Sequence, residues 1–544
     1  MKLIYDKTLR KVLLSIFIVS FAMVSFSATY YVSNAGNDSN SGLTTALAWK
    51  TLAKVNGRTF SPGDSILFQR GDIWREKLTV SSSGSSSASI VYSNYGTGVK
   101  PIIVGSNLAT KWTNQGGNVW KAATSLIRPW ENAGNRTANV FFINTDLSVG
   151  TGRLKTSTAN LTAEYNWYWA ANAIYVYSTT NPGTKYNSVE VAQRSYCVAV
   201  NTRNYIEVNG IDVFYATEAG LHEGQSTTTV QYGMTVRNCE SAYHGYPDNG
   251  GYGISVTVSN SLVENNVIHD CGRRGISIGL WSNVTVSNIV IQNNTFYNGY
   301  HTTSVDLQAD AGAGIIENIY IRKNLVYESP MFSPTSSPVY IFLSQQSTGA
   351  ANVRNIHITN NIFKYPANQC VQIDKIMGVF IYNNTFYAHT EVAGKSSYFL
   401  YVTNGSTGIK VKNNIFYSQL TYDSAVNGNA GAVYYLTSTQ NRANLESDYN
   451  IYYRVSPSLL LIRSDGTYAR YASKDSTTIR SLYGWETHSK FVDPKVKSAY
   501  NLTLQSNSKA INAGVNVGLT EDYNGNTIVG LPDIGAYEYR NSPE

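Results

Sequence analysis

The sequence is poor in several residue types, and each shortage excludes a class of protein. It holds only 4 cysteines in 544 residues, and none has the short paired spacing of zinc and redox motifs. Charged residues make up 14%, and Lys and Arg form no dense cluster of the kind that nucleic-acid-binding proteins carry. We therefore expect neither a zinc module nor a nucleic-acid partner, although the net charge of +7 is compatible with an acidic polysaccharide.

Long apolar runs are also missing after the N-terminus. Basic residues precede an apolar run at 12–24, and small residues follow at 25–28. This order of charged, apolar and small residues predicts a secretory signal peptide over 1–28, because the apolar run is too short for a membrane anchor. We expect a secreted protein, extracellular or periplasmic, with no membrane span.

Tyrosine and glycine are abundant, with 41 and 43 residues, and this composition favours β structure. The middle of the chain also repeats a short pattern that carries asparagine at its fourth position in most copies. Intervals of 27, 28, 30, 37, 23 and 30 residues separate these fourth positions, which is typical of a solenoid. The copies are VRNCES (236–241), VENNVI (263–268), IQNNTF (291–296), IRKNLV (321–326), ITNNIF (358–363), IYNNTF (381–386) and VKNNIF (411–416).

Each unit has the pattern of strands and turns. Apolar residues alternate, Asn, Gly and Ser then intervene, and no helical periodicity is sustained. Units stacked at the strand separation of about 4.8 Å would align the asparagines, whose amides can hydrogen-bond along the stack. The pattern predicts an all-β parallel β-helix with an asparagine ladder and capped ends.

Segments outside the repeats resemble parts of a known superfamily. TYYVSNAGNDSNSG (29–42) and FSPGDSILFQRGDIWREKL (60–78) precede the repeats, WYWAANAIYVYSTTNPGTKYNSVEVAQR (167–194) has the pattern of a small β module, and LPDIGAYEY (531–539) follows. With the repeats, they resemble the right-handed parallel β-helix superfamily of secreted polysaccharide lyases and glycoside hydrolases (pectate-lyase-like). The resemblance implies a carbohydrate-active enzyme with a cap and first coils over 29–110, an inserted module over 111–193, main coils over 194–451, and closing coils and a C-terminal cap over 452–544.

A second strand in each unit is expected to present small and polar residues on one outward face, which could admit a sugar chain. The strands are aligned on GLHEG (220–224), GISVT (253–257), GISIG (275–279), SVDLQ (304–308), PVYIF (338–342) and CVQID (370–374), and alternation sets the outward positions. These are His222, Ser255, Ser277, Asp306, Tyr340 and Gln372, followed two residues later by Gly224, Thr257, Gly279, Gln308, Phe342 and Asp374.

The turns before this strand are rich in titratable residues on three consecutive coils, which stacking would bring about 5–10 Å apart. Ordinary turn chemistry explains any one of these residues. Their repetition favours an active site. The candidates are His244, Asp248 and Tyr252; His269, Asp270, Arg273 and Arg274; and His301, Asp306 and Asp310.

The leading hypothesis is a lyase that acts by β-elimination on a uronate-containing glycan. A guanidinium would neutralise the sugar carboxylate, an imidazole would remove the proton, and a phenol would protonate the leaving oxygen. The residues for these roles are, in that order, Arg273 or Arg274; His269, His301 or His244; and Tyr252 or Tyr340.

Two alternatives stay open. An inverting glycoside hydrolase needs two separated carboxylates, and Asp306 and Asp374 are expected two coils apart, at about 10 Å. A non-catalytic carbohydrate-binding β-helix would instead use the abundant Tyr and Trp. The substrate-binding candidates are Arg273, Tyr252, Gln308, Tyr340, Gln372 and Asp374.

Calcium is the one cofactor that the sequence allows. Asp248, Asp306 and Asp310 could supply oxygen ligands to it. The resemblance implies that a calcium-dependent lyase of this fold would use a lysine or arginine base, and no lysine lies beside these aspartates on the aligned strand. We expect no metal and no other cofactor, and a monomer whose partner is a polysaccharide.

Overall fold

The computed structural model describes most of the chain after the predicted signal peptide, which lies outside the described residues. The described residues are 27–122, 126, 140–224, 228–245, 251–299, 303–309, 314–328, 339–345, 352–366, 368–388, 398–419, 432–436, 444–454, 460–464, 467–471 and 476–541.

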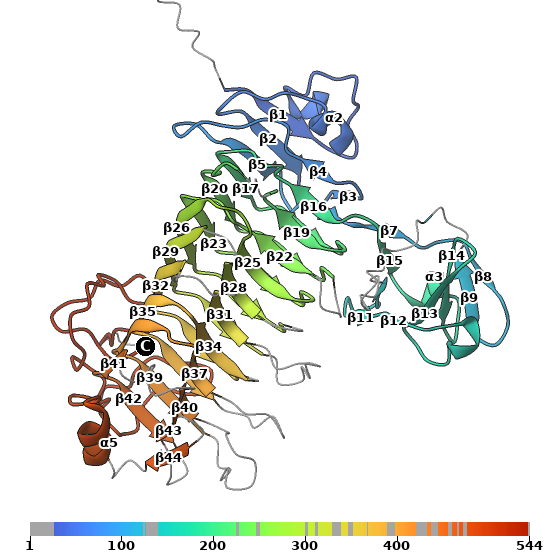
Figure 1. Ribbon diagram of the computed structural model, residues 1–544. Helices are drawn as coiled ribbons and strands as arrows, with labels where there is room; N and C mark the ends of the chain where they lie inside the picture. The colour runs from blue at the N-terminus through green and yellow to red at the C-terminus, as the bar shows by residue number, and fades with distance from the viewer. Residues whose placement is uncertain are drawn as a thin grey trace, which may run out of the picture.

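Three long sheets, named here sheets A, B and C, run along the molecule and form a parallel β-helix (Figure 1). Neighbouring strands in them pair in parallel, apart from β43 and β44, which are antiparallel. Consecutive strands alternate between the sheets, so that each coil returns to the same face. The predicted parallel β-helix fold is therefore confirmed.

Sheet A consists of β1 (Thr29–Val32), β2 (Ser65–Gln69), β5 (Ile90–Tyr95), β17 (Ile206–Asn209), β20 (Met234–Arg237), β23 (Ser261–Glu264), β26 (Thr285–Gln292), β29 (Ile315–Arg322), β32 (Val353–Thr359), β35 (Met377–Tyr382), β38 (Thr407–Lys412) and β41 (Leu445–Asp448). Sheet B consists of β3 (Ile73–Trp74), β6 (Ile102–Val104), β18 (Asp212–Phe214), β21 (Glu240–Ala242), β24 (Val267–His269), β27 (Thr295–Tyr297), β30 (Leu325–Tyr327), β33 (Ile362–Lys364), β36 (Thr385–Ala388), β39 (Ile415–Ser418) and β42 (Ile451–Arg454). Sheet C consists of β4 (Leu78–Thr79), β16 (Tyr196–Ala199), β19 (Ala219–His222), β22 (Tyr252–Ser255), β25 (Arg274–Leu280), β28 (Thr303–Ala309), β31 (Val339–Gln345), β34 (Gln369–Asp374), β37 (Tyr398–Thr403), β40 (Ala432–Leu436), β43 (Leu460–Ser464) and β44 (Thr467–Tyr471).

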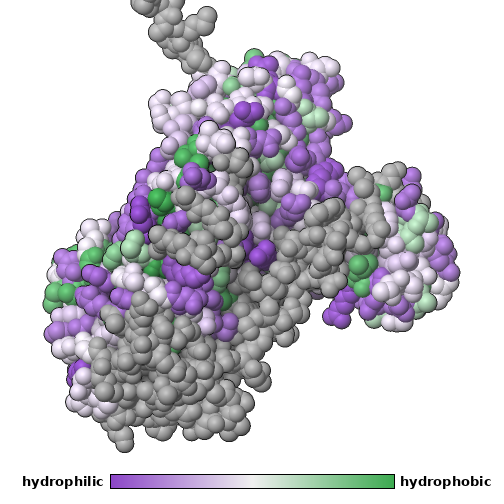
Figure 2. Space-filling model, in the orientation of Figure 1, coloured by the Kyte–Doolittle hydropathy of each residue, from purple (hydrophilic) through white to green (hydrophobic). Residues whose placement is uncertain are grey.

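Apolar side chains from the three sheets fill the interior of the β-helix. Equivalent positions on successive coils stack: the rings of Phe363, Phe386, Phe416 and Tyr452 follow one another with centroids 4.9, 4.8 and 5.3 Å apart. These spacings match the strand separation of about 4.8 Å, and burying each such side chain contributes roughly 1.5–3 kcal/mol. On the face drawn in Figure 2, hydrophobic residues are scattered among hydrophilic ones.

Buried asparagines form a hydrogen-bonded ladder at the turn between sheets A and B. Asn294 Nδ2 donates to Asn324 Oδ1 (3.1 Å) and to the Val263 carbonyl (2.9 Å), and the Asn294 backbone N–H also donates to Asn324 Oδ1 (3.0 Å). Each rung therefore bonds to the next coil through backbone and side chain, as the repeat predicts. The rungs are Asn266, Asn294, Asn324, Asn361, Asn384, Asn414 and Asn450.

The residue before each rung explains why the asparagines come in pairs. Asn265, Asn293, Asn360 and Asn383 have φ of 55°, 55°, 55° and 53°, in the left-handed region that asparagine tolerates better than other non-glycine residues. The first asparagine thus makes the turn and the second makes the ladder. Lys323 takes the turn position in one coil, with φ of 56°.

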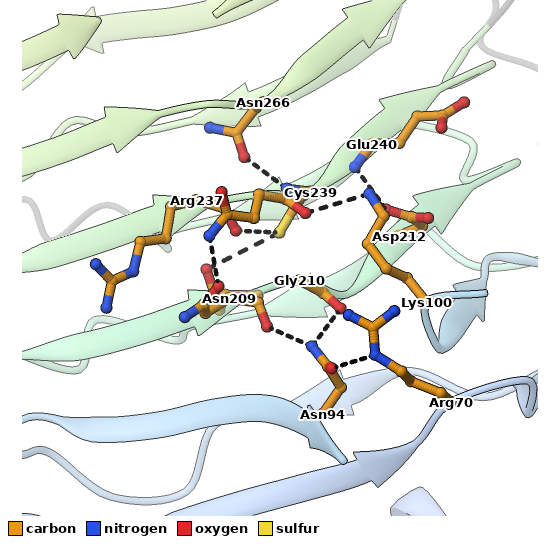
Figure 3. Close-up of polar contacts among 12 residues, drawn as sticks. Arg70, Asn94, Lys100, Asn209, Gly210, Asp212, Arg237, Cys239, Glu240 and Asn266 are labelled. Atoms are coloured by element: carbon orange, nitrogen blue, oxygen red, sulfur yellow. Dashed lines mark hydrogen bonds and ion pairs between the residues drawn. The ribbon is translucent and has the colours of Figure 1, made fainter. Parts of the chain in front are cut away.

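The ladder ends among polar contacts of the first coils (Figure 3). Cys239 occupies the next rung position, and its backbone N–H donates to Asn266 Oδ1 (3.0 Å). One coil further, the turn is held from outside, because Arg70 Nε donates to Asn94 Oδ1 (2.8 Å) and Asn94 Nδ2 donates to the Gly210 carbonyl (2.9 Å). Hydrogen bonds from Cys239 and Asn94 therefore replace the asparagine ladder in the N-terminal coils.

The C-terminal segment closes the other end and then returns along sheet B. The Asn450 backbone N–H donates to Ser489 Oγ (2.8 Å), which ends the ladder. Within the LPDIGAYEY segment, the Gly535 N–H donates to the Asn413 carbonyl (2.7 Å). The C-terminal segment therefore contacts the last ladder rung and also packs along sheet B. The helices near this cap and elsewhere are short, namely η1 (Thr45–Leu47), α2 (Leu52–Asn56), η2 (Thr158–Asn160), α3 (Pro182–Lys185) and α5 (Ser476–Tyr483).

A small module with its own hydrophobic core lies beside the N-terminal coils (Figure 1). Phe141 of the module is fully buried and contacts the rings of Tyr215 and Tyr243 at 4.8 and 5.9 Å, while Glu190 pairs with Arg75 at 2.6 Å. The module is therefore attached by both apolar and ionic contacts. Its two sheets consist of β7 (Ser106–Leu108), β10 (Val140–Ile143), β11 (Val149–Thr151) and β15 (Ser188–Ala192), and of β8 (Trp112–Asn114), β9 (Val119–Ala122), β12 (Arg153–Leu154), β13 (Asn166–Ala170) and β14 (Ala173–Tyr177).

Among the described residues, no helix has the length and apolarity needed to cross a membrane.

Replacing one rung should destabilise the whole β-helix. Asn324→Ala leaves the Asn294 side-chain N–H and the Ile291 carbonyl without their partner, so we expect the free energy of unfolding to fall by about 2–3 kcal/mol. Urea unfolding followed by circular dichroism measures this change. Asn283→Ala, at an exposed turn residue, is the matched control and should change stability by less than about 0.5 kcal/mol. Equal effects of the two substitutions would contradict the role of the ladder.

Candidate active site

Sheet C does not alternate strictly, and this decides which of its residues point outward. At the start of β25, Gly275 and Ile276 both point inward: Ile276 is fully buried in the core, and a Cβ at Gly275 would lie 3.1 Å from the ring of Phe296. Arg274 before them and Ser277 after them therefore both lie on the outer face. The register of neighbouring strands extends these positions into outward rows. The rows are Tyr252, Arg274 and Thr303; Ser255, Ser277, Asp306, Phe342, Gln372 and Tyr401; and Gly279, Gln308, Ser344, Asp374 and Thr403.

The predicted outward position of Tyr340 is wrong. Asp306 pairs with Phe342, and Tyr340 is only 1% exposed, with its hydroxyl donating to the Lys364 carbonyl (2.5 Å). Strict alternation assigns Tyr340 to the outer face, opposite Asp306. In the structure Tyr340 and Ile341 both point inward, so the outward residue opposite Asp306 is Phe342, two positions later. Tyr340 therefore cannot reach a substrate on this face.

Arg274 and Asp306 are adjacent, as predicted, but they are buried. Arg274 Nε lies 2.8 Å from Asp306 Oδ2, and the two side chains are 4% and 3% exposed. The contact is an ion pair without hydrogen-bond geometry, since Asp306 Oδ2 accepts no hydrogen bond from the described residues. Arg274 also donates to Gln308 Oε1 (2.7 Å) and to Ser277 Oγ (3.2 Å). Burial raises the pKa of Asp306 to about 6, and the nearby guanidinium only partly offsets it.

This burial corrects the predicted groove. The central part of the outer face of sheet C is closed, because Ser255, Ser277, Asp306 and Gln308 are 6%, 1%, 2% and 6% exposed. The guanidinium of Arg274 already has a carboxylate partner inside the protein. It is therefore not available to neutralise a sugar carboxylate.

His244 is also interior, against its predicted place in an exposed turn. It is fully buried, its Nδ1 accepts the Ala216 N–H (3.2 Å), and its Nε2 lies 3.1 Å from Ser241 Oγ. Burial lowers the pKa of His244 to about 3, so the ring is neutral. Both nitrogens are used within the fold, which makes His244 a structural residue.

The corner between sheets B and C holds a different group of polar residues, centred on His269. Its Nδ1 lies 2.7 Å from Asp270 Oδ2 and its Nε2 lies 3.1 Å from Glu240 Oε1. Burial alone would lower the pKa of His269, but the two carboxylates outweigh burial and raise it. Because carboxylates face both nitrogens, the site favours the doubly protonated ring over the neutral one. The hydrogen bond from His269 in turn lowers the pKa of Glu240, whose side chain is 37% exposed.

A stack of aromatic rings fixes this corner along the β-helix. His269, Tyr297 and Tyr327 occupy paired positions on successive coils. The His269 and Tyr297 rings are 4.4 Å apart and nearly parallel, at 7°, and the Tyr297 and Tyr327 rings are 5.4 Å apart at 18°. The residue after each ring leads into the turn to sheet C, so these turns also lie in register.

Glu328 follows Tyr327 and occupies the same turn position as Asp270, two coils away. It is 5% exposed, and its Oε2 has no hydrogen-bond partner among the described residues. Burial raises its pKa well above the usual value, although the backbone N–H groups of Gly299 and Asn298 bond to the carboxyl and oppose the shift. Glu328 therefore holds its proton more tightly than an exposed glutamate, and its Oε2 is a buried oxygen without a hydrogen-bond partner among the described residues.

The other predicted site residues are placed as follows. Tyr252 lies at the edge of the buried cluster, with the Arg274 guanidinium 5.2 Å from its ring centroid. Gln372 and Asp374 are partly exposed on the outer face of sheet C, coils away from the corner, and Arg273 is partly exposed in the corner turn. His301, Asp248 and Asp310 lie outside the described residues. In the part of the chain that the structure describes, no group of His, Cys, Asp or Glu could hold a metal ion.

Two site residues, Glu240 and Glu328, were not among the sequence candidates. Both belong to copies of the repeat, Glu240 in VRNCES and Glu328 just after IRKNLV. Aligning the coils on this strand, instead of on the following one, places Glu328 opposite Asp270. The sequence therefore held a signal for Glu328: it follows the ladder residue Asn324 at the same distance as Asp270 follows Asn266.

The chain is a right-handed parallel β-helix with a corner site built from carboxylates, a histidine and stacked tyrosines. No family model matches it. The structure of XylC in complex with xylose is similar, with 15% identity, coverage of 94% of this chain and 98% of that chain, and a TM-score of 0.56, which establishes the fold. Pectate lyase Pel9A has 15% identity, coverage of 95% and 98%, and a TM-score of 0.49.

One curated relative is similar in sequence. A lacto-N-biosidase of Bifidobacterium longum subsp. longum is 34% identical over 96 residues, which are 16% of this chain and 6% of the relative. The chain thus spans only a small part of the length of that relative.

The protonation of His269 can be measured directly. We expect its C2–H resonance to titrate above the usual pKa of 6.5, because Asp270 and Glu240 stabilise the imidazolium. Glu240→Gln removes one of these charges and should lower the measured pKa. His357, whose pKa burial lowers, serves as an internal reference that titrates below 6.5. A His269 resonance that titrates at or below 6.5 would show that the imidazolium is not the resting form.

Proposed function

We propose that the protein is an exported carbohydrate-active enzyme that hydrolyses a glycosidic bond of a polysaccharide at the corner between sheets B and C. Glu328 is the general acid and Asp270 the general base. The observation that carries this proposal is the pair of carboxyl groups at equivalent turn positions whose surroundings differ: burial raises the pKa of Glu328, whereas the Asp270 carboxylate contacts Nδ1 of His269.

The spacing of the coils supports an inverting reaction. Asp270 and Glu328 are two coils apart, which corresponds to about 10 Å between their backbones at the strand separation. Inverting glycosidases need roughly 6.5–9.5 Å between carboxyl groups, so that a water molecule fits beside the sugar. The proposal requires the two side chains to lean toward each other, which would bring the carboxyl groups into this range.

The other corner residues have supporting roles in this mechanism. His269 orients Asp270 through Nδ1 and keeps a positive charge beside it. Tyr297 and Tyr327 are partly exposed on the coils that lead from Asp270 to Glu328, and their rings could contact the sugar. Glu328 would donate its proton to the leaving oxygen while Asp270 takes a proton from the attacking water.

Elimination on a uronate glycan fits the described residues less well. Arg274 is paired with Asp306, and both ring nitrogens of His269 face carboxylates of the protein, so His269 is poorly placed to act as the base. The lacto-N-biosidase relative also favours hydrolysis over elimination by its name, within the short segment that it shares.

The reaction class is tested by the products and by two substitutions. On its polysaccharide, the protein should release reducing ends without the near-ultraviolet absorbance of an unsaturated product. Glu328→Gln and Asp270→Asn should each lower kcat about 10²–10⁴-fold, since each removes one partner of general acid–base catalysis. Proton NMR of the first product should show inversion at the anomeric carbon.

The matched control is Glu521→Gln, an exposed carboxylate on the C-terminal segment that pairs with Lys323 at 2.7 Å. It should leave kcat unchanged. Unsaturated products, or full activity of the Glu328→Gln variant, would contradict hydrolysis at this corner.

A further inference from the structure

An exposed tryptophan marks a second feature of sheet C, at the opposite end of β25 from the corner. Trp281 directly follows β25 and is 54% exposed, the only tryptophan among the described large hydrophobic residues with high exposure. Its six-membered ring occupies the space above Gly279, because a Cβ at that position would lie 2.3 Å from Trp281 Cη2. The ring is therefore supported by the backbone of its own strand while much of the indole is open to solvent.

The glycine is what allows this position of the ring. Gly279 points outward, since its neighbours Ile278 and Leu280 are buried in the core. The strand beneath the ring is fixed as well, because the Gly279 N–H donates to Thr257 Oγ1 (3.1 Å) and that hydroxyl donates to the Gly279 carbonyl (3.2 Å). A rigid support and a missing Cβ together hold an aromatic ring on the surface of the sheet.

A row of polar side chains continues from this ring along the β-helix. Gly279 pairs with Gln308, Gln308 with Ser344, and Ser344 with Asp374, one residue per coil. At about 4.8 Å per coil, the row extends roughly 14 Å from the ring. Gln308 and Ser344 are 6% and 3% exposed, whereas Asp374 is partly exposed, so the row opens toward its far end.

We propose that Trp281 and the open end of this row form a platform that binds a neutral polysaccharide chain at a distance from the cleaved bond. This inference rests on the proposed function and adds a second glycan-binding site to it. Apolar faces of sugar rings stack on aromatic side chains such as Trp281, and sugar hydroxyls bond to carboxylate groups such as that of Asp374, the partly exposed member of the row.

Charge favours a neutral chain over a uronate chain. The one ionisable group in the row is the Asp374 carboxylate, which accepts from Thr403 Oγ1 (2.9 Å) and Asn404 Nδ2 (2.6 Å). It would repel a sugar carboxylate, whereas it can accept hydrogen bonds from hydroxyl groups. The nearest guanidinium on this face, Arg274, is buried and paired with Asp306.

Distance separates the platform from catalysis. The seven residues of β25 lie between the corner turn and Trp281, which corresponds to about 23 Å along the strand. A short oligosaccharide in the corner cannot reach the ring, but a polymer can contact both. Loss of the platform should therefore weaken the binding of polymers and leave the turnover of short substrates unchanged.

Affinity electrophoresis tests this directly. The full-length mature protein with Glu328→Gln, which does not degrade the polymer, is run in native gels with xylan, galactan, hydroxyethyl cellulose or polygalacturonate. We expect at least one neutral polymer to retard it. Adding Trp281→Ala should weaken the apparent affinity about tenfold or more, as loss of a tryptophan anchor commonly does, while Trp281→Phe should retain most of it.

Two further variants control for folding and for general surface effects. Gly279→Ala keeps the tryptophan but adds a Cβ where the ring lies, so it should weaken polymer binding as Trp281→Ala does. Tyr500→Ala removes an aromatic side chain that is 89% exposed on the C-terminal segment, and it should change nothing.

The possible results distinguish failure of the proposed Trp281 platform from failure of the proposed catalytic site. Unchanged retardation of the Trp281→Ala variant, retardation in polygalacturonate alone, or no retardation in any neutral gel would overturn the platform. Activity of the Glu328→Gln variant would instead overturn the proposed catalytic pair. Trp281→Ala in the otherwise natural chain should turn over short substrates with the natural kcat and KM, and a large loss there would place Trp281 in the catalytic site.

Discussion

Register between stacked coils is the constraint on which the rest of this structure depends. The asparagine ladder sets it, because each rung bonds to the next coil through its amide and its backbone and leaves no alternative pairing for a buried polar group. A slip of one residue in any coil would break these bonds and turn a row of core residues outward. Side chains dozens of residues apart, such as Asp270 and Glu328, are neighbours only because that register is kept.

The ladder is also the reason why the fold could be predicted from the sequence. A left-handed turn residue followed by a buried amide selects asparagine twice in succession, so that pairs such as Asn265 and Asn266 appear at each coil. Few other structures require that combination. The outer face of sheet C has no such requirement: its strands begin with two inward residues, and nothing in the PVYIF segment distinguishes Tyr340 from the outward Phe342.

The sequence predicts where the polar residues of sheet C lie relative to one another, but it does not predict which of them are buried. Stacking correctly brought Arg274 to Asp306 and placed His269 at the corner of the same coil. Whether a polar residue serves a substrate or another residue of the protein depends on what covers it, and His244, Arg274 and Asp306 are used internally. Glu328 does not belong to the repeated histidines of the sequence, because what recurs at this turn position is an acidic or amide side chain, as in Asp270, Asn298 and Glu328.

The stacking of the coils also sets the distance between the carboxyl groups at the corner between sheets B and C. Turn positions after His269, Tyr297 and Tyr327 carry Asp270, Asn298 and Glu328, so the separation of the two carboxyl groups is a whole number of coils. One coil is about 4.8 Å, close to the roughly 5 Å at which a second carboxylate acts as nucleophile, and two coils leave room for water. Under the proposed hydrolysis, Asn298 in the intermediate turn, where a carboxylate would give the shorter spacing, would favour inversion over retention.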